Sequence, residues 1–185
     1  MSTLTTPTTQ EKSVYAIDAA HTTVEFIVRH LMISKVRGRF GTFEGAIELA
    51  PGSDVPKAID VKIDAASIDT REPQRDAHLK SPDFFDVENF SHLTFVSSRI
   101  EGAPDDFRIY GDLTIHGVTR EVVLNGSFEG RGSDPWGGER IAYSAQTNVN
   151  RKDFGVVWNQ ALETGGVVVS DEVRIELNVE AVLQK

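Results

Sequence analysis

The chain has 185 residues, a formal net charge of −9 and no cysteine. The lack of cysteine excludes disulfides, thiolate nucleophiles and cysteine-ligated metal centres, and the acidic balance argues against binding to nucleic acid or to an anionic membrane. A hydrophobic share of 39% with a charged share of 25% is typical of a globular domain, and the length suits one sizeable core.

The N-terminal residues are rich in threonine and contain neither a basic nor an apolar segment. Residues 1–13 are therefore predicted to form a flexible tail, and residues 14–185 a single domain. The lack of a visible secretory signal predicts a cytoplasmic location. No run approaches the roughly 20 apolar residues that span a bilayer, so no membrane span is expected.

Strict alternation marks the first strand, from Thr22 to His30. Val24, Phe26 and Val28 share one face with His30, which predicts a half-buried strand. A histidine on an apolar face is more often a hydrogen-bonded core residue than a ligand.

Three glycines lie within residues 36–45, at a spacing that fits no phosphate-binding loop. Glycine inside a strand permits the bulges and corners that a closing barrel needs, so this segment is predicted to bend. Strand character continues through Phe43 and Ile47, and a further alternating strand covers residues 59–64.

Residues 75–90 do not have the pattern of a strand. Ser81, followed by Pro82 and Asp83, predicts the start of a short helical turn there. Phe84, Phe85 and Phe90 lie in this otherwise charged segment, and our interpretation is a cap that plugs one end of a barrel. The alternative is a surface crossover whose aromatic rings fill the core. The cap would place four polar residues at the rim or in solvent: Arg75, Asp76, His78 and Lys80.

The remaining strands follow the same alternating pattern, with Phe95, Leu113 and Ile175 on their apolar faces. His116-Gly117 predicts a tight hairpin turn, and Trp158–Leu162 a short helical turn. The total of about eight strands joined by short connections is typical of an antiparallel meander, so we predict an all-β, eight-stranded antiparallel barrel with a short helical cap. Such a barrel is either filled by side chains or holds one slender ligand.

No motif for catalysis or metal binding is visible. The chain has no nucleophile elbow and no nucleotide-binding glycine loop. Its histidines are not spaced as metal ligands on one helix or strand; they are His21, His30, His78, His92 and His116. We therefore predict a protein that is not an enzyme, with no catalytic residues, no metal and no cofactor.

Several segments together resemble the YceI family of polyisoprenoid-binding, lipocalin-like proteins. The resemblance covers nearly the whole chain from Tyr15 onward, in the order of the family. The segments that carry it are residues 18–30, 36–45, 75–86, 111–119, 151–155 and 170–173, which include Asp18-Ala-Ala-His21-Thr22, Gly111-Asp112-Leu113-Thr114-Ile115-His116-Gly117 and Arg151-Lys152-Asp153-Phe154-Gly155.

The resemblance implies a lipocalin-like barrel that carries or sequesters a long isoprenoid lipid, of the polyprenyl phosphate or quinone type, in an apolar lumen. It also implies the absence of catalysis. The expected ligand-binding residues are those of the alternating apolar faces and of the two ends: Val24, Phe26, Val28, His30, Phe43, Ile47, Phe84, Phe85, Phe95, Leu113, Trp158 and Ile175.

Two other functions stay open at this stage. A hydrolase with His21 or His30 as its base would need a substrate pocket with a perturbed histidine. A stress-response or structural module acting through its surface, as a homodimer, would have a solid barrel and a contiguous exposed apolar patch.

Overall fold

The computed structural model describes residues 12–185 and contains one antiparallel sheet of eleven strands within them. The strands are β1 (Ser13–Ile17), β2 (Thr23–His30), β3 (Ser34–Phe40), β4 (Phe43–Leu49), β5 (Pro56–Asp64), β6 (Ile68–Asp69), β7 (His92–Ala103), β8 (Asp106–Ile115), β9 (Val118–Ser133), β10 (Glu139–Asn150) and β11 (Glu172–Leu183). One α-helix, α1 (Pro73–Lys80), and the short 3₁₀ turns η1 (Ala19–His21), η2 (Ala65–Ser67) and η3 (Arg151–Phe154) complete the fold.

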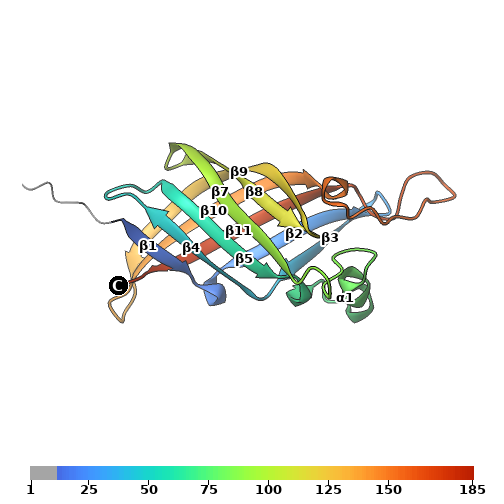
Figure 1. The fold of residues 1–185 in the computed structure, drawn as a ribbon, viewed down its shortest axis with the longest axis horizontal. Coiled ribbons are helices and arrows are strands. Elements are labelled where there is room, and N and C mark those ends of the chain that lie inside the picture. Colours follow the sequence, from blue (N-terminus) through green and yellow to red (C-terminus); the bar gives the residue numbers. More distant parts are fainter. Residues whose placement is uncertain (1–11) are drawn as a thin grey trace, which may run out of the picture.

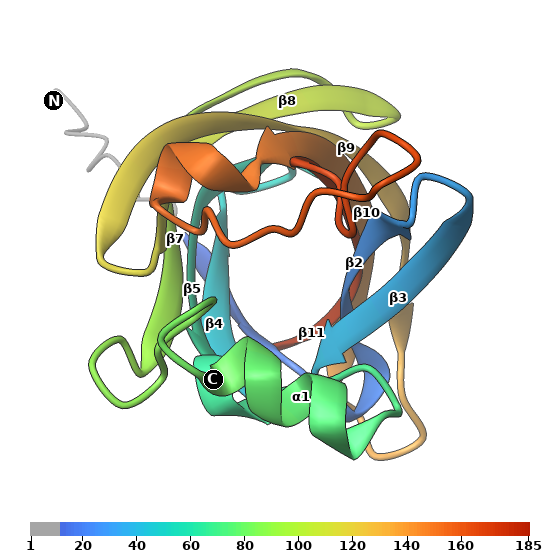
Figure 2. The same cartoon turned by 90° about the vertical axis from the view of Figure 1, so that its right-hand side faces the viewer.

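The sheet closes on itself because β1 pairs with both β4 and β11 (Figures 1 and 2). β1 and β2 pair with successive parts of β11 and form one barrel strand interrupted by η1. β3 and β4 likewise form one strand, and the segments that pair with it, β5 and β6, form another that is interrupted by η2. The eleven segments thus make eight barrel strands, and the predicted eight-stranded antiparallel barrel is confirmed.

The glycine-rich segment contains the predicted bend. β3 ends at Phe40 and β4 begins at Phe43, so the break falls on Gly41 and Thr42. The His116-Gly117 turn joins β8 to β9, and both residues have positive φ, 53° and 71°. Such φ values are those of the mirror-image turns that suit the twist of a hairpin.

The prediction at Ser81 is wrong in one respect: a hydrogen-bonded turn does begin there, with the Ser81 hydroxyl accepting from the Asp83 amide at 3.3 Å and the Ser81 carbonyl from the Phe84 amide at 3.0 Å, but the α-helix does not. Helix α1 begins earlier, at Pro73. The Glu72 carboxylate accepts hydrogen bonds there from the amides of Gln74 and Arg75. Ser81 instead ends the helix, because the residue before a proline is disfavoured in helical conformation. The short helical cap itself is present.

The predicted helical turn at Trp158–Leu162 is also wrong. That segment is extended, and Ala161 forms an isolated bridge with Val167. The turn lies earlier, in η3, and ends at Gly155, whose φ of 75° suits glycine.

The two ends of the barrel differ in packing. One end is closed by a large cluster whose most buried members include Tyr15, Leu49 and Phe107. Polar contacts hold its loops: the Tyr143 hydroxyl donates to the Asp54 carbonyl at 2.9 Å, and Arg131 pairs with the Asp54 carboxylate at 2.9 Å. The other end carries α1 and the segment 156–170 (right in Figure 1). The predicted tail at residues 1–13 lies outside the described residues except for Lys12, which pairs with Glu48, and Ser13.

Candidate ligand-binding cavity

The barrel encloses a cavity of about 380 Å³ that is lined almost wholly by apolar side chains. This volume lies within the range of ligand pockets. All twelve residues expected to bind a ligand lie on its wall: Val24, Phe26, Val28, His30, Phe43, Ile47, Phe84, Phe85, Phe95, Leu113, Trp158 and Ile175. The barrel is therefore not solid, as the alternative of a module acting only through its surface would require.

Glycines on neighbouring strands explain why large aromatic residues leave this lumen open. A methyl group built at Gly38 would overlap the ring of Phe26, its partner across β2 and β3. A methyl group at Gly111 would likewise overlap the ring of Phe95, although the register partner of Phe95 is Leu113. Because each glycine leaves room for a ring against the sheet, the rings line the wall instead of filling the centre. Alternation cannot reveal this, since it depends on the register between strands.

An aromatic cluster lies at the outer end of the cavity. The rings of His78, Phe84 and Trp158 have centroids 4.8 to 5.3 Å apart, and Phe84 is only 8% exposed. His78 is fixed by the Asp83 carboxylate, 2.8 Å from its Nε2. We call these three rings the mouth cluster.

The three phenylalanines of the predicted cap have separate positions. Phe85 packs edge-on against Phe40, which contacts Phe26, so rings run from the cap to the cavity wall. Phe90 lies against His116 and above Gly117, and does not line the cavity. The prediction that Phe90 plugs the barrel is therefore wrong.

Arg151 holds the segment that carries Trp158, a role that the sequence did not indicate. Its guanidinium donates to the carbonyls of Val156 and Trp158, each at 2.8 Å, and to that of Ser170 at 2.9 Å. The side chain is 7% exposed, and burial lowers the pKa of its guanidinium. A planar donor with five N–H groups suits several carbonyls at once, so Arg151 fixes one side of the mouth.

A second arginine, Arg75, also lines the cavity near its mouth. Its Nε donates to the Thr70 hydroxyl at 2.7 Å and its Nη2 to the Thr70 carbonyl at 2.8 Å. Asp76 accepts from the Thr70 amide and hydroxyl. Arg75 forms no ion pair within residues 12–185, so it places a cation at the mouth. His30 is exposed at the same end, which corrects the expectation of a hydrogen-bonded core histidine.

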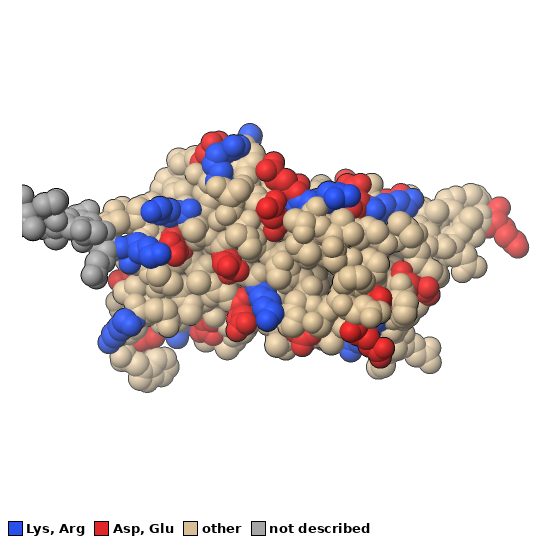
Figure 3. Space-filling view, viewed as in Figure 1, with Lys and Arg blue, Asp and Glu red and all other residues tan. Residues whose placement is uncertain are grey.

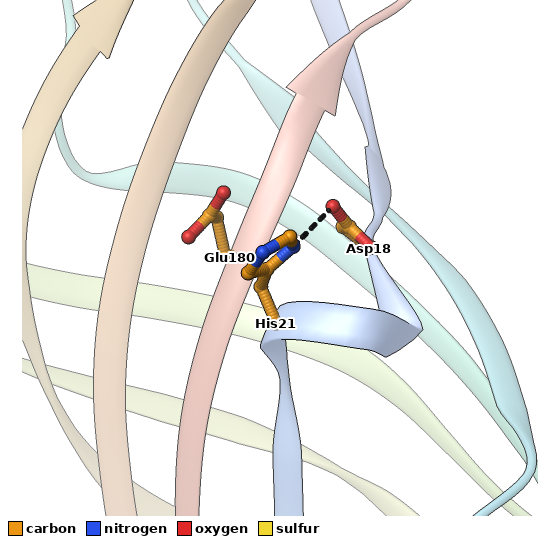
Figure 4. A group of neighbouring side chains, drawn as sticks. All are labelled: Asp18, His21 and Glu180. Atoms are coloured by element: carbon orange, nitrogen blue, oxygen red, sulfur yellow. Dashed lines mark hydrogen bonds and ion pairs between the residues drawn. The ribbon is translucent and has the colours of Figure 1, made fainter. Parts of the chain in front are cut away.

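Asp18, His21 and Glu180 form a cluster on the outside of the barrel (Figure 4). Arg140 already lies between the two carboxylates, with its Nη1 2.7 Å from Asp18 and 2.6 Å from Glu180. These contacts with Arg140, and the bond to His21, hold the pKa of Asp18 at about 2. A metal ion would have to displace Arg140, so the cluster is best described as an ion-pair network. His21 does not line the cavity.

A closed antiparallel barrel with an apolar cavity and a capped mouth belongs to the lipocalin-like class of folds. The YceI-like domain matches residues 15–181, and the chain belongs to the YceI family. The resemblance seen in the sequence is thereby confirmed. Among residues 12–185, no helix has the length and apolar character needed to cross a membrane.

The chain is similar to proteins of several bacteria. A UPF0312 protein of Vibrio cholerae is 36% identical over 91% of this chain and 86% of its own length, and one of Staphylococcus aureus is 37% identical over 90% and 95%. The Campylobacter jejuni YceI protein structure is 30% identical with a TM-score of 0.75, covering 85% of this chain and 90% of its own. Burkholderia cenocepacia BcnA, at 23% identity and a TM-score of 0.77, shares the fold over 89% and 99%.

Proposed function

We propose that this protein binds one long-chain isoprenoid lipid in the barrel cavity and carries or sequesters it without chemical change. The observation that carries the proposal is the apolar lumen, with aromatic rings at its wall and its mouth. Burying apolar surface is the main favourable contribution to binding such a ligand, and each methylene contributes about 0.8 kcal/mol. A branched hydrocarbon chain is the ligand chemistry that this wall fits best.

A domain from Saccharophagus degradans described as polyisoprenoid binding shares the fold. It has a TM-score of 0.66 over 92% of this chain and 98% of its own, at 16% identity. At that identity it supports the fold alone, so the choice of ligand rests on the cavity.

The mouth favours a lipid with an anionic head group over a neutral one. Arg75 on α1 lines the cavity with its guanidinium bonded to Thr70, and no carboxylate pairs with it within the described residues. A guanidinium pairs well with phosphate oxygens. We therefore favour a polyprenyl phosphate over an isoprenoid quinone as the ligand.

A catalytic role has little support in this arrangement. His21 lies outside the cavity and is bound to Asp18. His30 borders the cavity, but no carboxylate orients its ring among the described residues. We therefore keep the prediction of a protein that is not an enzyme. A cytoplasmic location and a homodimer also stay predictions.

Native mass spectrometry of protein purified from its own host tests the proposal directly. We expect a species heavier than the polypeptide that loses one apolar molecule on gentle activation, and extraction should identify an isoprenoid. A protein that is always empty, and that takes up no added polyprenyl phosphate, would contradict the proposal.

A further inference from the structure

The turn between β2 and β3 exposes three consecutive apolar residues. Leu31, Met32 and Ile33 are 37%, 50% and 80% exposed. Ile33 gains little from burial in this fold, and Leu31 and Met32 are only partly covered. We call residues 29–35 the hairpin tip.

The backbone of the hairpin tip is also strained. Leu31 and Met32 have φ values of 52° and 61°. A branched or long side chain is disfavoured in this left-handed region, where asparagine and glycine are the usual residues. The turn therefore keeps Leu31 and Met32 at a cost in the stability of the protein. We infer that a contact outside this fold favours these two side chains.

The charges of the hairpin tip add a third unfavourable feature. Arg29 and Lys35 face each other across β2 and β3, and like charges in that position repel. Neither forms an ion pair within residues 12–185, and residues 29–39 contain no acid. On a chain with a net charge of −9, this is a local basic site around an apolar centre.

The hairpin tip borders the mouth of the cavity. His30 and Val169 both line the cavity and form a bridge, and the Leu31 amide donates to the Val168 carbonyl at 2.8 Å. On the facing segment, Val156 and Trp158 line the cavity while Val157 between them is 61% exposed.

The projecting end of the molecule, at the right of Figures 1 and 3, shows few charged side chains. Glu163 is the only acid within residues 156–170. Exposed apolar residues thus border the mouth on the side of the hairpin tip and residues 156–170, whereas the α1 side carries charged residues such as Arg75 and Asp83.

We propose that the hairpin tip and Val157 insert into the surface of an anionic lipid bilayer and so place the cavity mouth on the membrane. Apolar side chains flanked by cations are the composition that binds at such an interface. A lipid could then enter the cavity without crossing water. This proposal rests on the proposed function. It also accounts for the local basic site at Arg29 and Lys35, which the net negative charge of the whole chain does not reveal.

Co-sedimentation with vesicles tests the docking. We expect binding to vesicles of phosphatidylcholine with phosphatidylglycerol, and weaker binding to phosphatidylcholine alone. Arg29→Gln with Lys35→Gln should weaken binding about fivefold per cation, and salt raised from about 0.1 M to about 1 M should have a similar effect. Met32→Ser with Ile33→Ser should weaken it at least about tenfold.

Trp136→Ser is the matched control. Trp136 is 85% exposed on the turn between β9 and β10, at the closed end of the barrel. We expect this variant to bind vesicles as the parent protein does. Loss of binding in Trp136→Ser but not in Met32→Ser with Ile33→Ser would overturn the proposal.

The double substitution Leu31→Asn with Met32→Gly separates loss of vesicle binding from loss of folding. These residues suit positive φ, so the variant should melt at a higher temperature and yet lose vesicle binding. A variant that is more stable and still binds vesicles would contradict the proposal. A second contradicting result would be that the parent protein dimerises with rising concentration, and that the hairpin-tip substitutions abolish the dimer but leave vesicle binding intact.

Titration with a short, water-soluble prenyl phosphate in the absence of vesicles separates the two proposals. Hairpin-tip variants that keep this binding and lose docking support docking at the mouth. If the parent protein docks but binds no prenyl phosphate, the proposed function fails and the docking surface stands on its own.

Discussion

The far end of the Phe26 ring lies against Gly38, its partner on the neighbouring strand, and this contact keeps the ring against the cavity wall. Gly38→Ala should push the ring into the lumen. We expect a loss of about 1–3 kcal/mol in the free energy of unfolding, as overpacking produces, together with weaker binding of a prenyl lipid. Chemical denaturation and a lipid titration measure the two effects.

Gly132→Ala serves as the control, because a methyl group at Gly132 would meet no atom within 4 Å. It should change stability by no more than about 0.5 kcal/mol. Equal effects of the two substitutions would mean that Phe26 does not depend on the space at Gly38.

Removal of the rings at the mouth should speed the release of a bound lipid. Phe84 packs against His78 and Trp158, and Phe85 against Phe40. Phe84→Ala and Phe85→Ala should each raise the dissociation rate, since changes in affinity at one site appear mainly in that rate. Stopped-flow measurement with a fluorescent prenyl lipid would detect it.

Phe90→Ala is the matched control for the mouth, because Phe90 packs on His116 outside the cavity. It should reduce stability and leave the dissociation rate unchanged. If Phe90→Ala and Phe84→Ala release lipid equally fast, general loosening of the cap would explain the result instead.

The charge of Arg75 should discriminate between head groups. We expect Arg75→Gln to weaken binding of a polyprenyl phosphate about tenfold, because a hydrogen bond to a charged group contributes about 1.5–3 kcal/mol. Binding of a neutral isoprenoid quinone should be unchanged. Arg71→Gln, in the loop just before α1 and away from the cavity wall, should alter neither ligand. An equal loss for both ligands in Arg75→Gln would contradict a role in reading the head group.

The ion-pair network around Arg140 should make stability depend on acid pH. Arg140 and His21 depress the pKa of Asp18 to about 2 in the folded protein, below its unfolded value of about 3.9. The contribution of Asp18 is therefore complete above about pH 4 and is lost as pH falls toward 2.

Asp18→Asn keeps the size of the side chain and removes its charge. It should cost roughly 0.5–1 kcal/mol at pH 7, and the difference from the parent protein should disappear near pH 2. A difference that does not change between pH 7 and pH 2 would show that the charge of Asp18 is not its cause. Thermal melts across this pH range provide the comparison.

Much of the barrel could be predicted from alternation, because each inward position is set by the residues of one strand. Val24, Phe26 and Val28 were placed on the cavity side in this way, and the structure has them there. The open lumen was expected only from the family resemblance and could not be predicted from alternation, since it depends on which residue of a neighbouring strand faces each ring, as Gly38 faces Phe26.

The errors in the cap have a local cause. Both Glu72-Pro73 and Ser81-Pro82-Asp83 have residues that suit a helix start; the first starts α1, whereas the second caps only a hydrogen-bonded turn. Ser81 precedes a proline, which opposes helix at that position. The role of Arg151 was missed because its acceptors are backbone carbonyls, which leave no mark in the sequence.

Titration with a long polyprenyl phosphate, compared between the parent protein and Phe26→Trp, tests most directly whether the lumen holds the lipid. The larger ring should occupy part of the cavity, so we expect saturable binding of one molecule by the parent protein, much weaker binding by Phe26→Trp, and nearly equal stability of the two empty proteins. Equal lipid binding by both, with Phe26→Trp less stable by about 1–3 kcal/mol as in an overpacked core, would contradict this account.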